Sequence, residues 1–240
     1  MLERLIDHAA LFPPASMSLE DALAEDRRAR ESPYAEVIGR FVVPSDRLPD
    51  LPDDRPALSV VLRDDDTDLL RVTAGVEAVE TRLHGPRPRP DELIASYRKI
   101  EALGVETYFE LVLDDDWRDS VPATIGAIAA LGARVKLRCG GEVTPTVEQV
   151  GLVIASCREA GVPFKCTAGL HHAVRRGEEH GFLNILAATA APPGAIEAVL
   201  AEEDAADLDV DGADRALFVG FGSCSWREPV DDLVELGLLA

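Results

Sequence analysis

The fold of this chain is decided by two short segments, Arg134-Val135-Lys136-Leu137-Arg138-Cys139-Gly140-Gly141 and Pro163-Phe164-Lys165-Cys166-Thr167-Ala168-Gly169-Leu170-His171-His172. Both contain an apolar core that runs into glycine, and the sequence between them has the length and periodicity of a helix. This is the pattern of consecutive parallel strands joined by a helix. Each segment also carries a lysine, a residue rarely buried without a partner. We therefore expect chemistry to explain the two lysines.

Eight such segments occur along the chain, and nearly all are followed by helix-like sequence. They begin near Leu5, Val37, Ala57, Val76, Val105, Arg134, Pro163 and Ala216. This count predicts an α/β fold of the (β/α)8 barrel type, whose strands are buried on both faces and read as near-continuous apolar runs. An open doubly wound parallel sheet is the alternative, because the first strand is short. No break in composition marks a boundary, so we expect residues 1–240 to form one domain.

Helix boundaries follow from capping residues, prolines and glycines. We expect helices that start at Ser18, at Pro90, near Pro122, at a Thr144 cap with Pro145 in the first turn, and at Pro229. Glycines at positions 104, 132 and 161 are expected to end three of them.

Composition limits the kinds of partner. The 240 residues are 47% hydrophobic, and 44 acidic against 24 basic residues give a net charge of −20. This charge repels nucleic acid and anionic membranes, and no apolar run approaches the thickness of a bilayer. We expect a cytoplasmic protein that needs no cofactor and keeps its four cysteines reduced, since none forms a C-x-x-C pair. Assembly into a homo-oligomer is compatible with this sequence.

Charged side chains lie on several predicted strands. Barrel enzymes place their sites at the C-terminal ends of the strands, so the charged residues of strands four to seven could all point to one mouth: Glu80, Glu110, Lys136, Arg138 and Lys165. A buried layer of ion pairs is the competing interpretation, and we favour such a structural role for Glu80. For the two lysines we favour function, because burial beside another cation lowers a lysine pKa and frees the amine. Their convergence predicts a positive mouth that binds a small anionic substrate.

The order of these residues resembles deoxyribose-phosphate aldolase and related class I aldolases. The resemblance covers the last hundred residues or so, and rests on a lysine on strand six, a lysine on strand seven and a Gly-Ser segment after strand eight. It implies that Lys136 forms a Schiff base and that Lys165 lowers its pKa. It also implies that the last loop holds a phosphate through Gly222, Ser223 and Ser225.

Further residues complete this hypothesis. Glu110 would transfer protons, and the substrate would be bound by Arg138, Thr167 and His171. The phrases around the lysines and around His171-His172 are also similar to those of a bacterial barrel family to which no activity is attached.

Two other functions remain open from the sequence. His8 and His171, together with Glu110, could form a metal site of a hydrolase or isomerase, although the adjacent His171 and His172 point to opposite sides of a strand. Alternatively, the lysines and Arg138 could bind an anion without catalysis. Trapping of an imine, metal analysis and ligand-induced stabilisation would separate the three.

Overall fold

The strands of this protein close on themselves. In the computed structural model, which describes residues 1–63 and 67–239, each strand pairs in parallel with the next, and the first pairs with the last. The strands are β1 (Ile6–His8), β2 (Ile38–Pro44), β3 (Leu58–Val61), β4 (Val76–Arg82), β5 (Glu106–Glu110), β6 (Arg134–Arg138), β7 (Phe164–Thr167) and β8 (Phe218–Ser223). The predicted (β/α)8 barrel is therefore confirmed, and the open sheet is excluded.

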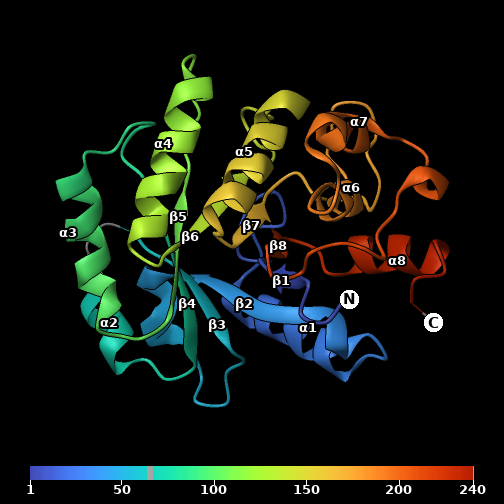
Figure 1. The fold of residues 1–240 in the computed structure, drawn as a ribbon. Coiled ribbons are helices and arrows are strands. Elements are labelled where there is room, and N and C mark those ends of the chain that lie inside the picture. The colour runs from blue at the N-terminus through green and yellow to red at the C-terminus, as the bar shows by residue number, and fades with distance from the viewer. Residues whose placement is uncertain (64–66, 240) are drawn as a thin grey trace.

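Helices surround the strands, as Figure 1 shows. They are α1 (Leu19–Glu31), α2 (Thr67–Val72), α3 (Pro90–Glu101), α4 (Trp117–Ala130), α5 (Val147–Ala160), α6 (Phe182–Ala188), α7 (Ile196–Ala201) and α8 (Arg227–Glu235). Short 3-10 turns are η1 (Ala35–Val37), η2 (Ser45–Asp50), η3 (Pro193–Ala195) and η4 (Ala205–Asp207). Both α6 and α7 lie between β7 and β8 in the chain, so this connection is longer than the others.

The apolar core lies between the strands and the helices. In β6, Val135 and Leu137 are buried in the same apolar cluster as Val153 and Ile154 of α5. The intervening Lys136 points to the other side, into the barrel, because successive side chains of a strand face opposite ways. The outer face of the strands thus holds the fold together, and the inner face is free to carry polar groups.

Helix α5 begins two residues later than its sequence suggests. Its cap is Thr146, whose hydroxyl accepts the N–H of Gln149, while the Gln149 side chain accepts the N–H of Thr146. This reciprocal capping box outcompetes the predicted Thr144 cap, and leaves Pro145 outside the helix. The predicted cap of α1 is confirmed, since Ser18 accepts the N–H of Asp21.

Two other helices begin earlier than predicted. Helix α4 starts at Trp117, and Pro122 lies inside it at the loss of one backbone hydrogen bond. Helix α8 starts at Arg227 rather than Pro229, which falls within the first turn, where its missing N–H costs nothing.

Glycines bring the ends of β6 and β7 into contact. A Cβ on Gly140 would lie 2.7 Å from the Cα of Gly169, and one on Gly169 would lie 2.8 Å from the Cα of Gly140. Gly169 also has a φ of +67°, which an L side chain rarely adopts. Only glycine therefore fits at both positions, and the loops that follow the two lysine strands touch each other.

Candidate active site

Five charged side chains form a continuous chain of ion pairs inside the barrel. In order they are Asp7 of β1, Lys165 of β7, Glu80 of β4, Lys136 of β6 and Glu110 of β5. Every link between a nitrogen and an oxygen is between 2.6 and 2.9 Å, and all five residues are buried. Signs alternate along the chain, so each lysine lies between two carboxylates.

Lys165 is the most enclosed of the cations. Its Nζ lies 2.6 Å from Asp7 Oδ2 and 2.7 Å from Glu80 Oε1, and it faces the Tyr108 ring at 5.4 Å. Burial by itself would lower the pKa of Lys165, but the charges of Asp7 and Glu80 outweigh it, and the pKa is raised above its usual value. Lys165 is therefore a firmly held ammonium in the resting protein.

Lys136 lies between Glu80 and Glu110. Its Nζ is 2.7 Å from Glu80 Oε2 and 2.9 Å from Glu110 Oε2. Burial lowers the pKa of Lys136, whereas Glu80 and Glu110 raise it, and the net direction is upward. The sequence predicts a lowered pKa for Lys136, and this does not hold in the resting state, because the charges of Glu80 and Glu110 outweigh burial.

Glu80 joins the two lysines through its two oxygens. Burial would raise the pKa of Glu80, but Lys136 and Lys165 together hold it well below the usual range of a carboxyl group. Ser59 Oγ donates a further hydrogen bond to Glu80 Oε1 at 2.7 Å. The sequence favoured a structural role for Glu80 in a buried layer of ion pairs, and its pairs with Lys136 and Lys165 fit that role. Its position at the centre of the network was not expected.

Neither Asp7 nor Ser59 is among the site residues expected from the sequence. Asp7 accepts the backbone N–H of Arg40 through Oδ1 at 2.7 Å, which orients its other oxygen toward Lys165. A usable signal was present: Asp7, Ser59 and Glu80 are each a polar residue embedded in an apolar strand segment, and such a residue must face the barrel interior or stay unsatisfied.

The C-terminal mouth carries several predicted binding residues. Arg138, the last residue of β6, is exposed and donates from Nε to the carbonyl of Gly140 at 3.0 Å. Its neighbour across the strands is Thr167, and a Cβ on Gly222 would lie 3.3 Å from the Thr167 hydroxyl. Arg138, Thr167 and Gly222 are thus brought together at one end of the barrel.

Ser223, the last residue of β8, and Ser225 after it bond to the backbone around them. Ser223 donates from Oγ to the carbonyl of Ser225 at 2.6 Å, and Ser225 Oγ accepts the N–H of Glu228 at 3.4 Å in the first turn of α8. These bonds shape the loop that leads into α8. Its role in holding a phosphate stays a prediction.

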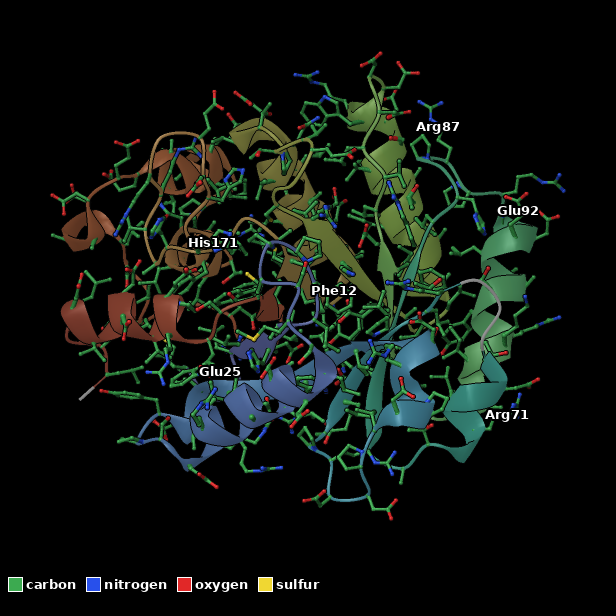
Figure 2. All side chains as sticks on the ribbon, turned by 180° about the vertical axis from the view of Figure 1, so that it is seen from behind. Phe12, Glu25, Arg71, Arg87, Glu92 and His171 are labelled. Atoms are coloured by element: carbon green, nitrogen blue, oxygen red, sulfur yellow. The ribbon has the colours of Figure 1, made fainter. Side chains whose placement is uncertain are left out.

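The histidines do not meet. His171 Nδ1 lies 3.0 Å from Glu228 Oε2, and Figure 2 shows His171 beside the helices of the C-terminal part, away from the centre of the ring. His172 lies 3.4 Å from Asp232, and His8 is fully buried against Asp26 of α1. The structure therefore does not support the alternative of a metal site built from His8, His171 and Glu110. In residues 1–63 and 67–239, no group of three metal-binding side chains is suitably placed.

The cations do not converge on one mouth as the sequence suggests. Arg138, the last residue of β6, lies at the C-terminal mouth, whereas Lys165 lines a cavity together with residues from the N-terminal ends of the strands. Lys136 is the register partner of Lys165 and is buried between Glu80 and Glu110. The side chain of Lys136 is 7% exposed, against 2% for Lys165. Lys136 is thus the more accessible of the two.

Comparison with known proteins finds a solved structure with a similar fold. No family model matches the chain, and no curated protein matches it. Among solved structures, it is similar to the tetrameric deoxyribose phosphate aldolase from Aeropyrum pernix, with a TM-score of 0.62, 16% identity, and coverage of 98% of this chain and 92% of that one. This likeness supports the (β/α)8 fold. In the part of the chain that the structure describes, no helix is long and apolar enough to cross a membrane.

Proposed function

We propose that this protein is a Schiff-base enzyme of the class I aldolase type, which acts on a small anionic carbonyl compound through an imine at Lys136. The observation that carries the proposal is the position of Glu80, which links Lys136 and Lys165 through its two oxygens inside the barrel. The similarity in fold to an aldolase supports the same class of chemistry by analogy.

The use of lysine in this chain adds weight to the proposal. The chain has only three lysines, Lys99, Lys136 and Lys165, and every other basic residue is an arginine. Arginine is the usual choice for a buried ion pair, whereas lysine can give up its proton and attack a carbonyl. Two of the three lysines of the chain lie inside the barrel, which indicates that the site requires a side-chain amine.

The raised pKa of Lys136 sets a condition on the reaction. An ammonium cannot attack, so its proton must first pass to Glu80 or Glu110, both within hydrogen-bond distance. A substrate in the mouth excludes water, and desolvation favours the neutral amine and acid over the ion pair. The amine then attacks the carbonyl carbon. The carbonyl oxygen takes one proton from the attacking nitrogen and one from the carboxyl group that had accepted it, and leaves as water, so that a protonated imine remains.

Lys165 has a different role in this scheme. It stays charged, keeps Glu80 ionised between proton transfers and positions it against Lys136. Arg138 and Thr167, with Gly222 and Ser223 at the end of β8 and Ser225 after it, would bind the anionic part of the substrate. His171 pairs with Glu228 outside this group and has no part in the scheme. The solved aldolase is tetrameric, and a homo-oligomer is proposed here as well. Light scattering on the purified chain tests that part.

The test is reductive trapping. Wild type, Lys136→Met, Lys165→Met and the control Lys99→Met are incubated with small aldehydes, keto acids or sugar phosphates and borohydride, and the labelled residue is mapped by mass spectrometry. We expect an adduct on Lys136 that Lys136→Met abolishes, Lys165→Met slows and Lys99→Met leaves unchanged, since Lys99 is exposed on α3.

Two results would contradict the proposal. Labelling confined to Lys165 would reverse the roles of the lysines. The absence of an adduct with every compound of the panel, in protein of native stability, would favour a buried ion-pair layer or an anion-binding barrel without catalysis.

A further inference from the structure

A polar cavity lies at the N-terminal end of the barrel, opposite the mouth. It has a volume of about 210 Å³. Glu106 and Arg134, the first residues of β5 and β6, line it, as do Arg4 and Arg215, which precede β1 and β8. In most barrels this face serves stability, so a cavity here that reaches the buried Lys165 requires an explanation.

The charges around the cavity are unbalanced. Arg4 and Arg40 both pair with Glu77, while Arg40 and Arg134 both pair with Glu106. Three guanidinium groups therefore share two carboxylates. Lys165 contributes no excess charge, because Asp7 and Glu80 already surround it.

A fourth guanidinium, that of Arg215, has no carboxylate partner among the described residues. It donates to the carbonyls of Phe218 at 2.6 Å and Glu3 at 3.0 Å. Burial lowers the pKa of Arg215, and the charge of Asp7 offsets only part of this effect. Four cations around two acids leave an excess of about two positive charges on a chain whose net charge is −20.

Strand β8 contributes two adjacent residues to the wall of the cavity. Gly220 lines it with a φ of +149°, and a Cβ there would lie 2.6 Å from the carbonyl oxygen of Leu5. The adjacent Val219 is half-buried and also lines the cavity.

Guanidinium groups match the geometry of oxyanions, and their hydrogen bonds to charged oxygens are among the strong ones in proteins.

We propose that this N-terminal cavity binds a small phosphate-type oxyanion, either free phosphate or the phosphate of a small ester. A dianion would neutralise the excess charge of the four arginines. Asp7 also lines the cavity and would repel the anion, whereas Lys165 would be attracted to it. Binding would therefore weaken the ion pair between Lys165 and Asp7. The site is separate from the anion loop proposed at the mouth, and it stands whether or not Lys136 forms an imine.

The test compares two substitutions of nearly equal volume. Binding of inorganic phosphate to the full chain is measured by calorimetry at low ionic strength for wild type, Val219→Asp and Val219→Asn. We expect Val219→Asn to bind within about twofold of wild type and Val219→Asp to bind at least tenfold more weakly, because only the acid repels the anion. Glycerol 3-phosphate as a second ligand distinguishes an ester from free phosphate.

Further variants keep the test decisive. Arg4 is half-exposed at the rim, so Arg4→Gln should fold and weaken binding about threefold even if Val219→Asp fails to fold. Arg47→Gln removes an exposed arginine that lies outside the cavity lining, and should leave phosphate binding within twofold. Equal binding by the two Val219 variants, loss of binding in Arg47→Gln, or no binding of phosphate by wild type would overturn the proposal.

Discussion

Lys136 and Lys165 are each held 2.7 Å from a different oxygen of one carboxylate, that of Glu80. Glu80 is fully buried, so water cannot take its place as the partner of either lysine. Any change in the charge of Glu80 is therefore felt by both lysines at once. This coupling governs stability as well as the proposed chemistry.

Replacement of Glu80 by glutamine should destabilise the protein strongly. The amide keeps the shape but removes the charge between two buried ammonium groups, and breaking a buried pair costs about 3–5 kcal/mol. Urea unfolding measures the change. Asp50→Asn is the control, since its pair with Arg47 is exposed and should contribute less than about 1 kcal/mol. Equal effects of the two would contradict this view of the network.

The network should also set how stability depends on pH. The pKa of Glu80 is lowered on folding, so its contribution is complete above the ordinary value of 4.5 and is lost as pH falls further. The pKa of Lys136 is raised, so its contribution is complete below 10.5 and is lost as pH rises above that value. Each group changes the free energy of unfolding by up to about 1.4 kcal/mol per pH unit in its window.

Unfolding by urea between pH 3 and 11 measures this dependence. We expect a plateau from these groups between about pH 5 and 10. Glu80→Gln should flatten the acid limb relative to wild type. An acid limb of unchanged slope in that variant would show that Glu80 is not linked to folding as the structure indicates.

The capping of α5 offers a prediction with a built-in control. Thr146→Ala removes the hydroxyl that accepts the Gln149 N–H, and should cost about 1 kcal/mol. Thr144→Ala removes the threonine that the sequence suggested as the cap, and should change the free energy of unfolding by less than about 0.5 kcal/mol. If Thr144→Ala destabilised the protein more than Thr146→Ala, Thr144 would be the cap, as the sequence predicts.

Three glycines should respond differently to alanine. Gly220→Ala places a Cβ 2.6 Å from the Leu5 carbonyl at a positive φ, and should cost about 2 kcal/mol or more. Gly222→Ala meets Thr167 at 3.3 Å, so its main effect should fall on ligand binding at the mouth. Gly126→Ala, inside α4 with open space around it, should be neutral or stabilise by up to about 1 kcal/mol. Thermal melting of the three variants ranks them.

The fold could be predicted because its signals are local. Apolar strand segments, punctuated by glycine and proline, locate all eight strands, and the order of strand and helix then implies a barrel. Helix starts were less secure, because Thr144 and Thr146 are both acceptable caps in isolation. The choice depends on Gln149, whose side chain bonds back to Thr146.

The site could be predicted only in part, because its contacts cross the barrel. Lys136 and Lys165 are conspicuous as cations in apolar strands. Their carboxylate partners come from β1, β4 and β5, and no sequence spacing reveals that Glu80 lies between the lysines. The pKa of Lys136 is raised by Glu80 and Glu110, whereas burial and the second lysine alone predict a lowered pKa.

The contact between Gly140 and Gly169 has a consequence for how this barrel can change. Loops of such barrels are often regarded as independent modules, each free to vary on a constant scaffold. Here the loops after β6 and β7 meet backbone to backbone, with no side chain between them to absorb a change. An insertion or graft in one would displace the other, so the two would have to be exchanged together as a single unit.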